Sequence, residues 1–335
     1  MKKPNPLLED LKPLLPLIAA NATRAEQQRQ VPDENIALLK SIGLHRAFQP
    51  QAYGGMEISL PAFADCIALL AGACASTAWA MSLLCTHSHQ LAMFPARLQE
   101  EIWGTDRDAT ASSSIAPFGR IEEVEGGLLF SGEMGWSSGS DHAEWAIVGC
   151  RRANAEGTQD YCFAVLPRSA YQIRDDWHAA GMKGSGTKTL IIDNVRVPAA
   201  NIVGGPAMWN QGWKLLAGRA LDVEKLEITA VAFGIARAAL DEAWDYAQSR
   251  VQFGKPISQH QAIRHKLVVA RTKLQAARHM LYHAAWLANE GRPCSAETSM
   301  AKLFVADVGV EIALACQQVI GSYALSDAFD MERHV

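Results

Sequence analysis

The sequence of 335 residues lacks a strong excess of either charge, and this absence narrows the class of partner. Its 31 basic and 35 acidic residues give a formal net charge of -4, and no run of Lys and Arg resembles a patch for nucleic acid or anionic lipid. With 49% hydrophobic and 20% charged residues, the composition is typical of a globular chain with a sizeable core. A small or neutral partner is expected, with no nucleic acid and no membrane.

Features of an exported protein are also missing. Two lysines stand near the start, but prolines and the acidic pair Glu9 and Asp10 interrupt the apolar residues there, so we expect neither a signal peptide nor a membrane span. The cysteines are odd in number and lie mostly in apolar runs, which is typical of reduced buried thiols in a cytoplasmic protein. They are Cys66, Cys74, Cys85, Cys150, Cys162, Cys294 and Cys316.

No G-x-G-x-x-G motif follows a predicted strand, which argues against a Rossmann nucleotide site. Helical patterns fill residues 1 to about 105, short alternating strands follow from about 108 to 202, and helical periodicity returns after 212. The sequence therefore predicts an α+β protein with an N-terminal helical domain (1–105), a middle β domain (106–206) and a C-terminal helical-bundle domain (207–335). Any nucleotide cofactor must be held in another way.

Several elements can be predicted individually from these patterns. A helix is expected where Ile36, Leu39 and Ile42 recur before a stop at Gly43, and the Ala- and Leu-rich run 60–89 predicts helices buried nearly all round. Alternation between turn residues predicts strands at Gly127–Gly132, Glu144–Cys150, Tyr161–Leu166 and Thr189–Val197. Two long C-terminal helices are expected, one over Ser258–Asn289 and one with a seven-residue repeat of Leu226, Phe233, Leu240 and Ala247.

The segment Gly135–Gly139 places an indole and a hydroxyl two residues apart, which is one face if the chain is extended. Trp136 can then lie against a planar flavin while Ser138 offers a hydrogen bond to the edge of the ring. The segment also spells G-x-S-x-G, the nucleophile elbow of serine hydrolases, but that motif needs a strand followed by a helix, and here a second strand follows. A third interpretation is a buried Trp beside turn serines.

Three segments of the first 205 residues carry a resemblance to a known family: Cys85–His89, Ser112–Pro117 and Trp136–Gly139. The whole chain resembles the acyl-CoA dehydrogenase superfamily, which implies an N-terminal helical domain, a middle β-barrel or sandwich domain and a C-terminal four-helix bundle. Residues 1–205 resemble the oxygenase components of two-component flavin-dependent monooxygenases of the p-hydroxyphenylacetate 3-hydroxylase type. Such enzymes take reduced FMN or FADH2 from a separate reductase, form a C4a-hydroperoxide with O2 and transfer one oxygen atom to a phenol.

This resemblance implies roles for individual residues. Ser138 would hydrogen-bond near flavin N5, Trp136 and Trp79 would line the flavin site, and His87 with Ser113 would hold the phenolic hydroxyl. A hydroperoxide needs a site that excludes water, and a His near the phenol can favour the more nucleophilic phenolate. An inert core histidine is the alternative for His87, and a metal site with Cys85 and His89 is disfavoured because His87 points away from both in a helix; no metal is expected.

Residues from about 212 onward resemble an ordinary acyl-CoA dehydrogenase, through Arg250–Ile257 and Gln318–Gly321. The resemblance implies that Arg250 and Phe253 touch the FAD of a neighbouring subunit and that Gln318 lies near its pyrophosphate, which favours FAD and a homotetramer. Ser322 and Ala324 stand where the family usually has glycines, so side chains could crowd the phosphate there. For Arg250 the alternative is a solvated charge at a helix end.

The segment Leu221–Leu226 resembles the position of the catalytic glutamate in some acyl-CoA dehydrogenases. Glu224 would then abstract the α-proton of a thioester, whereas the plain alternative is an exposed first-turn glutamate that complements a helix dipole. The two parts of the chain resemble different subfamilies, and the chain stops at Val335 where homologues continue, so the alternatives are a natural mosaic, an engineered chimera and an incomplete reading frame. Aromatic hydroxylation is the favoured function, acyl-CoA dehydrogenation is the second hypothesis, and a flavin-binding or assembly protein without turnover is the third.

Overall fold

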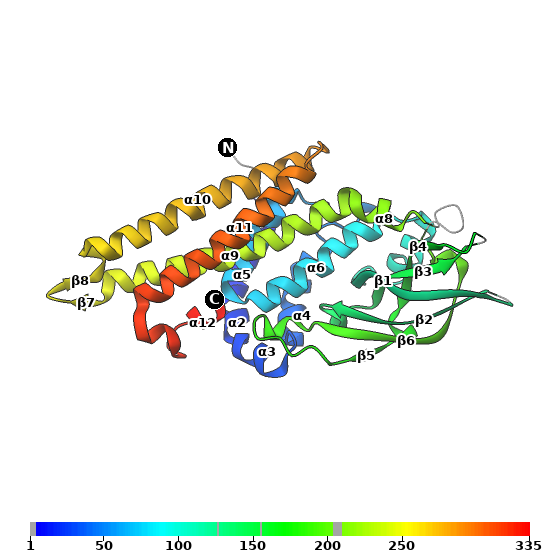
Figure 1. Cartoon of the computed structure of the whole chain (residues 1–335), viewed down its shortest axis with the longest axis horizontal. Coiled ribbons are helices and arrows are strands. Elements are labelled where there is room, and N and C mark those ends of the chain that lie inside the picture. The colour runs from blue at the N-terminus through cyan, green and yellow to red at the C-terminus, as the bar shows by residue number, and fades with distance from the viewer. Residues whose placement is uncertain (1–4, 126, 155, 204–209) are drawn as a thin grey trace. The chain divides into compact units, whose positions relative to one another are not determined.

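The structure is a computed structural model that describes residues 5–125, 127–154, 156–203 and 210–335. Along the chain, helices come first, strands follow, and long helices end the chain (Figure 1). Contacts divide the chain into two compact units: unit 1 is Met1–Ile58 with Trp79–Glu224, and unit 2 is Ser59–Ala78 with Lys225–Val335. The predicted α+β class is confirmed. The boundary between the units falls inside two helices, α6 (Ala75–Leu91) and α9 (Leu221–Ser249).

The helices that precede the strands follow the apolar pattern of the sequence. Helix α4 buries Ile36 and Leu39 and is followed by Gly43, whose φ of 77° suits glycine and ends the helix as predicted. The predicted helical run 60–89 forms α5 (Leu60–Ala73) and α6, and most of its side chains are buried. The remaining α-helices before the strands are α1 (Pro6–Leu11), α2 (Leu15–Ala20), α3 (Ala22–Gln28), α4 (Asp33–Ser41) and α7 (Ala96–Trp103).

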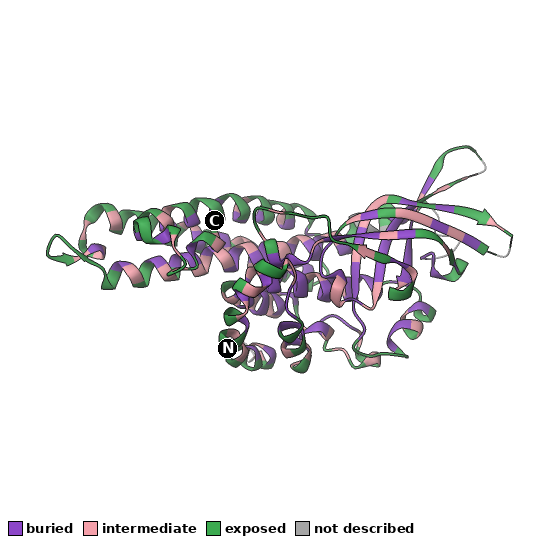
Figure 2. Ribbon diagram, turned by 90° about the horizontal axis from the view of Figure 1, so that it is seen from below, coloured by how far each residue is buried: buried purple, intermediate pink, exposed green. Residues whose placement is uncertain are grey.

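The strands of unit 1 form one six-stranded sheet with the order β4-β3-β1-β2-β6-β5. β1 pairs with β3 in parallel, and the other neighbours are antiparallel. Strands β3 and β4 contain runs of consecutive buried residues, and alternate residues of these runs belong to two separate hydrophobic clusters, so both faces of the sheet are covered there (Figure 2). The strands are β1 (Ala111–Val124), β2 (Gly127–Ser137), β3 (Trp145–Ala153), β4 (Gln159–Pro167), β5 (Gln172–Arg174) and β6 (Lys188–Val197).

Unit 2 is helical, and its long helices are α5, α9, α10 (Gln261–Asn289) and α11 (Ser295–Ile320). The predicted seven-residue repeat of α9 is buried at all four positions. Helix α5 packs on α10, where Tyr282 donates a hydrogen bond to Asp65. A Cβ on Gly234 of α9 would lie 2.3 Å from the carbonyl oxygen of Ala68, so only glycine allows α5 and α9 to approach this closely.

Short elements complete the described chain: α8 (Gly212–Leu215), β7 (Val251–Gln252), β8 (Lys255–Pro256) and α12 (Met331–His334). The segment Ser295–Leu325 is long and apolar enough to cross a membrane by length and composition alone, and 39% of its most apolar window is buried within the protein. Its exposed apolar residues include Leu303 at 65% and Val310 at 54%. All seven cysteines are buried free thiols, as predicted.

Candidate functional site

The end of β2 places Trp136 and Ser138 differently from the prediction. The pairing of β2 with β6 shifts register between Met134 and Ser137, and Trp136 has a φ of 59°, a left-handed conformation that is unusual for a bulky residue. Trp136 is therefore 59% exposed and Ser138 only 6% exposed. The expectation that the two side chains share one face of an extended strand is wrong, because the bulge and the positive φ break the two-residue period.

Trp136 nevertheless presents an aromatic surface. Its ring lies 5.8 Å from the ring of Phe118 on β1, tilted by 47°, and both side chains are half exposed or more. Large aromatic side chains are usually covered in a folded domain, so an exposed pair is a candidate contact for a flat apolar ligand. The serine-hydrolase interpretation is not supported, because a short turn with η4 (Ser140–His142) leads from β2 into strand β3 rather than into a helix.

A buried histidine links α6 to the first strand of the sheet. His87 is 1% exposed; its Nδ1 lies 2.8 Å from the carbonyl oxygen of Ala111, and its Nε2 lies 2.8 Å from Oγ of Ser113. Burial lowers the pKa of His87 to about 4, so the ring is neutral near pH 7. A carbonyl can only accept, so Nδ1 carries the proton and Nε2 accepts a hydrogen bond from the Ser113 hydroxyl.

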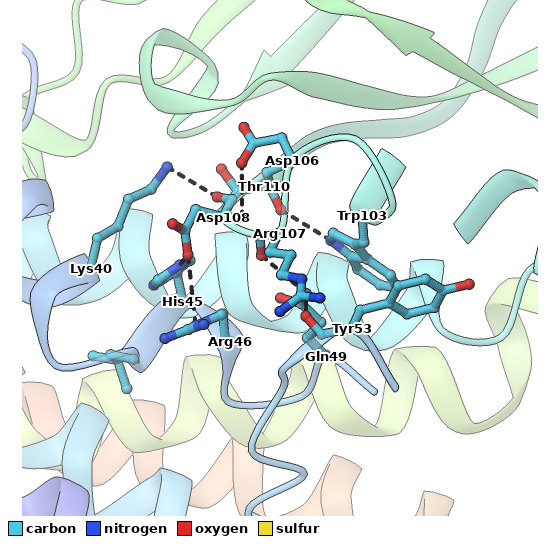
Figure 3. Close-up of polar contacts among 12 residues, drawn as sticks. Lys40, His45, Arg46, Gln49, Tyr53, Trp103, Asp106, Arg107, Asp108 and Thr110 are labelled. Atoms are coloured by element: carbon cyan, nitrogen blue, oxygen red, sulfur yellow. Dashed lines mark hydrogen bonds and ion pairs between the residues drawn. The ribbon is translucent and has the colours of Figure 1, made fainter. Parts of the chain in front are cut away.

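The loop between α7 and β1, which leads into Ala111, is held by side-chain contacts (Figure 3). Trp103 Nε1 donates to the carbonyl oxygen of Ala109 at 3.1 Å, and His45 Nε2 lies 2.8 Å from the carboxylate of Asp108. The hydrogen bond from His45 lowers the pKa of Asp108, while burial lowers the pKa of His45 itself. These contacts hold the start of β1, and therefore the carbonyl group that fixes the tautomer of His87, in one place.

Glu224 is not the exposed first-turn glutamate that its plain alternative supposes. It lies in the first turn of α9, but it is 8% exposed and accepts a hydrogen bond from Nε2 of Gln90. Burial raises the pKa of Glu224 to about 7. Gln90 is three residues after His87, so both project from one side of α6, and the carboxyl group of Glu224 lies in the same unit of the chain.

The hydroxyl of Ser138 belongs to a polar group inside unit 1. Trp79 Nε1 donates to Ser138 Oγ at 3.1 Å, and Thr187 Oγ1 lies 2.7 Å from the same atom. Ser185 Oγ lies 2.9 Å from Thr187 Oγ1, which extends the group by one more hydroxyl. Trp79 and Ser138, which the resemblance assigns separately to the flavin site, are therefore in direct contact.

Three of the six predicted cofactor residues lie in unit 2 rather than in unit 1: Arg250, Phe253 and Gln318. Arg250 follows the C-terminus of α9 and places its guanidinium 5.9 Å from the ring centre of Tyr323. Phe253 is 93% exposed with a φ of 52° in the turn between β7 and β8. Gln318 accepts a hydrogen bond from Lys266 Nζ at 2.7 Å. The exposed Phe253 is available for contact with another molecule.

The alternative metal site would need His87, Cys85 and His89 together. Cys85 Sγ instead donates to the carbonyl oxygen of Leu44, and His89 packs edge-on against Phe48 with 5.8 Å between ring centres. Among residues 5–125, 127–154, 156–203 and 210–335, no three His, Cys, Asp or Glu side chains are grouped so that they could hold a metal ion.

Four contributors to the site were not predicted from the sequence: Ala111, Gln90, Thr187 and Ser185. Ala111 acts through its backbone carbonyl, which leaves no sequence signal. Gln90 could have been found, because it lies at i+3 from His87 and therefore on the same helical face. Thr187 and Ser185 become neighbours of Ser138 only through the pairing of β2 with β6, which brings distant residues together.

Comparison with known proteins gives the following matches. Residues 210–335 match the family described as acyl-CoA dehydrogenase, C-terminal domain. The oxygenase component of p-hydroxyphenylacetate 3-hydroxylase from Acinetobacter baumannii is 63% identical over 196 residues, which are 58% of this chain and 46% of that relative. The chain thus spans about half the length of this curated relative.

Two solved structures resemble the whole chain. The crystal structure of 3-HSA hydroxylase from Rhodococcus sp. RHA1 matches with a TM-score of 0.85 and 26% identity over 98% of this chain and 89% of that one. Butyryl-CoA dehydrogenase from Megasphaera elsdenii matches with a TM-score of 0.89 and 23% identity over 98% and 90%, respectively, which shows a common fold. The predicted acyl-CoA dehydrogenase-like fold is confirmed.

Proposed function

Residues 210–335 belong to the acyl-CoA dehydrogenase C-terminal domain family, and from this premise we propose that the protein is the oxygenase component of a flavin-dependent aromatic monooxygenase. The observation that carries the proposal is the hydrogen bond in unit 1 between the partly buried Ser113 and the buried His87, with 2.8 Å between Oγ and Nε2. The similarity to an oxygenase component at 63% identity over 196 residues supports it. The fold alone does not decide the reaction, because dehydrogenases and hydroxylases share it.

The residues of unit 1 fit a flavin. Trp136 and Phe118 offer an exposed aromatic surface for a flat ring, and Ser138 offers a hydroxyl that can donate or accept at the edge of that ring. When bound, a reduced flavin supplies the electrons that activate O2 and delivers one oxygen atom to the substrate. Trp79 holds Ser138 in position through the hydrogen bond from its indole nitrogen.

Ser113 and His87 together accept the hydroxyl group of a phenol in this proposal. Ser113 donates its own proton to Nε2 of His87, so the lone pairs of Ser113 remain available to accept the phenolic O–H. Because His87 is neutral, its Nε2 can accept the Ser113 proton, which makes the Ser113 oxygen a stronger acceptor for the phenolic O–H and raises the electron density on the phenol oxygen. A polarised phenol is a better nucleophile at the carbon that receives oxygen, which favours hydroxylation.

A separate flavin reductase and a homotetramer belong to the same proposal, together with a cytoplasmic location. The reductase follows from the relative, which is named an oxygenase component. Apolar side chains of α10 and α11 are exposed in unit 2, including Val269 at 53% and Leu303 at 65%, and a contact with further copies of the chain would cover them. Phe253 and Arg250 would then reach a flavin of a neighbouring subunit, which favours FAD over FMN.

Acyl-CoA dehydrogenation is the second candidate because of Glu224. A carboxyl group with a pKa of about 7 can take up a proton near neutral pH, which an α-proton base must do. Its burial at 8% exposure and the hydrogen bond from Gln90 hold it in a fixed position. The proposed hydroxylation assigns no step to the carboxyl group of Glu224. A third candidate, a flavin-binding or assembly protein without turnover, predicts flavin affinity with neither reaction.

One experiment separates the three candidates. Purified protein receives either reduced flavin, air and a simple phenol, or oxidised FAD and an acyl-CoA under argon. The proposal predicts a catechol in the first mixture and no bleaching of FAD in the second. Bleaching without catechol would establish the dehydrogenase instead, and flavin binding with neither product would establish the third candidate. The variant Glu224→Gln should leave catechol formation within about twofold, since only the dehydrogenase needs its carboxylate.

A further inference from the structure

We propose that Ser138, Thr187 and Ser185 form a hydroxyl relay whose direction reverses with the redox state of the bound flavin. The relay would let Ser138 accept a hydrogen bond from a reduced ring and donate one to an oxidised ring. This inference rests on the proposed function, because it needs a flavin beside Ser138. It assigns a positioning role to Thr187, which neither the sequence motifs nor the comparisons with known proteins indicate.

The relay consists of three hydroxyl groups in a row. Ser138 Oγ and Thr187 Oγ1 are 2.7 Å apart, and Thr187 Oγ1 and Ser185 Oγ are 2.9 Å apart. Ser138 and Ser185 are 6% and 3% exposed, so bulk water has little access to either end group. At the first hydroxyl, the indole nitrogen of Trp79 is a donor that cannot accept, and it occupies one lone pair of Ser138.

Because the indole nitrogen of Trp79 can only donate, the number of free lone pairs on Ser138 depends on the direction of its hydrogen bond with Thr187. A hydroxyl has one proton and two acceptor lone pairs, and Trp79 already fills one lone pair of Ser138. If Thr187 donates to Ser138, both lone pairs are filled and Ser138 must donate to a ligand. If Ser138 donates to Thr187, its second lone pair is free and Ser138 must accept from a ligand. The direction of the relay therefore decides whether Ser138 presents a donor or an acceptor.

A bound flavin would need Ser138 as an acceptor when the ring is reduced and as a donor when the ring is oxidised. Its central nitrogen carries a hydrogen in the reduced ring and a bare lone pair in the oxidised ring, so it changes from donor to acceptor. Rotation of the hydroxyls about their C–O bonds reverses the relay, and no O–H bond is broken and no net proton moves. Without an alternative acceptor, a Ser138 that faces the N–H of a reduced ring would leave its own buried proton unpaired, which is unfavourable.

Contacts made by Lys188, the residue after Thr187, keep Thr187 close to Ser138. Lys188 follows Thr187 directly and pairs with Ser137 across β2 and β6. Its Nζ lies 2.8 and 2.7 Å from the two carboxylate oxygens of Asp141, which is three residues after Ser138. Both Lys188 and Asp141 are largely buried, at 9% and 15% side-chain exposure. This ion pair clamps the strand that carries Thr187 to the turn that carries Ser138.

The test uses Thr187→Val, which keeps the shape of the side chain and removes the hydroxyl, with Thr187→Ser as the matched control. Dissociation constants for oxidised and reduced flavin are measured under argon, together with the midpoint potential of the bound flavin. In Thr187→Val, Ser138 can still donate to an oxidised ring but has lost the acceptor it needs beside a reduced ring. We expect the affinity for reduced flavin to fall about tenfold more than that for oxidised flavin.

A tenfold selective loss corresponds to a midpoint potential about 30 mV lower for a two-electron couple. Thr187→Ser should keep both affinities and the potential close to wild type. Equal weakening of both redox states, or no change, would overturn the relay, because a purely structural role does not distinguish the two rings. If Thr187→Val fails to fold by circular dichroism, Ser185→Ala gives the same test with a smaller shift in the same direction, and no shift there would overturn the relay.

The measurements also distinguish failure of the proposed function from failure of the relay alone. If the wild-type protein binds neither oxidised nor reduced flavin, the proposed function and the relay both fall. If the wild type binds flavin and hydroxylates a phenol but Thr187→Val leaves the difference between the two affinities unchanged, only the relay falls. A crystal structure of the complex with the reduced flavin should place a ring nitrogen within hydrogen-bond distance of Ser138 Oγ, and a nearest ligand atom beyond that distance would also overturn the relay.

Discussion

The two units of the chain use burial in different ways. Unit 1 buries polar side chains that can take part in a reaction. They are His87, Ser138 and Glu224, and each is at most 8% exposed. The long helix α9 in unit 2 instead buries its repeat of Leu226, Phe233, Leu240 and Ala247, while other apolar side chains of unit 2 stay exposed. In unit 1 burial changes the protonation of functional groups, and in unit 2 it mainly stabilises helix packing. We infer that the first unit carries the reaction and that the second supports assembly and cofactor contact.

The pKa values in unit 1 show how burial tunes chemistry. Loss of solvation is the main cause in each case, and it lowers the pKa of His87 and of His89 to about 4 and raises the pKa of Glu224 to about 7. All three shifts favour the neutral form. A neutral His87 can accept the hydroxyl proton of Ser113, which the proposed binding of a phenol requires.

The largest effect is expected for Leu240→Ala in unit 2. Leu240 is 0% exposed within the repeat of α9, and removal of a buried leucine leaves a cavity that costs about 2–5 kcal/mol of unfolding free energy. Chemical denaturation followed by circular dichroism measures the change. Leu303→Ala is the matched control, because Leu303 is 65% exposed and should change the stability of the isolated chain by less than about 0.5 kcal/mol. Equal effects of both variants would contradict the assignment of the core.

The pH dependence of stability should show the buried His87. Its pKa of about 4 lies below the ordinary value of 6.5, so the unfolded chain takes up the proton first as the pH falls. The stability that this histidine contributes is therefore complete above pH 6.5 and is lost as the pH falls from 6.5 to 4, by up to about 3 kcal/mol. Denaturation at several pH values should give a flatter profile for His87→Gln than for the wild type.

Burial also lowers the pKa of His89 to about 4, so His89 gives a second test of how stability depends on pH. His89→Gln should flatten the profile by a similar amount, and the two changes should add roughly, because each removes one proton from the difference between the folded and unfolded states. A profile for His87→Gln that is as steep as that of the wild type between pH 4 and 6.5 would show that His87 is solvated.

The coupling of oxygen use to product tests the role of His87 in unit 1. In His87→Ala, Ser113 loses the acceptor for its proton, so we expect product per O2 consumed to fall about tenfold, with hydrogen peroxide in its place. Flavin affinity should stay within about twofold, since His87 is assigned to the phenol and not to the ring. Ser113→Ala should behave in the same way. An unchanged product yield in both variants would remove His87 and Ser113 from the substrate site.

The smallest effect is expected for Phe253→Ala in unit 2. Phe253 is 93% exposed in the described chain, so its removal should leave the stability of the chain within about 0.5 kcal/mol. If Phe253 contacts a flavin across a subunit boundary, the affinity for FAD should fall a few-fold while the affinity for FMN changes less. Fluorescence titration with both nucleotides measures this difference. Identical affinities in the variant and the wild type would confine the cofactor site to unit 1.

The sequence predicted much of the fold because local patterns determine it. The repeat of α9, the helical stop at Gly43 and the strands β2, β3, β4 and β6 all follow from spacing and turn residues, and the structure confirms them. The resemblance assigned His87 and Ser113 to one substrate site, and the structure places their side chains in contact, while their role toward a substrate stays a prediction. The domain boundaries at 105 and 206 stay a prediction.

The remaining features depend on contacts between distant residues or on local exceptions. The positive φ of Trp136 and the bulge beside it could not be derived from a two-residue period, and they separate Trp136 from Ser138. The burial of Glu224 depends on Gln90, which is 134 residues earlier in the chain, so a first-turn position alone suggested exposure. Thr187 meets Ser138 through sheet register, which single-sequence patterns do not specify.

The most direct test of the central claim is to follow the oxygen atom. The protein is supplied with reduced flavin, a phenol and isotopically labelled O2, and the product is analysed by mass spectrometry. We predict that each molecule of hydroxylated product carries one labelled oxygen atom, and that His87→Ala forms far less of it while consuming O2 at a similar rate. Product without the label, or no hydroxylated product from any simple phenol while an acyl-CoA reduces the bound flavin, would contradict the account.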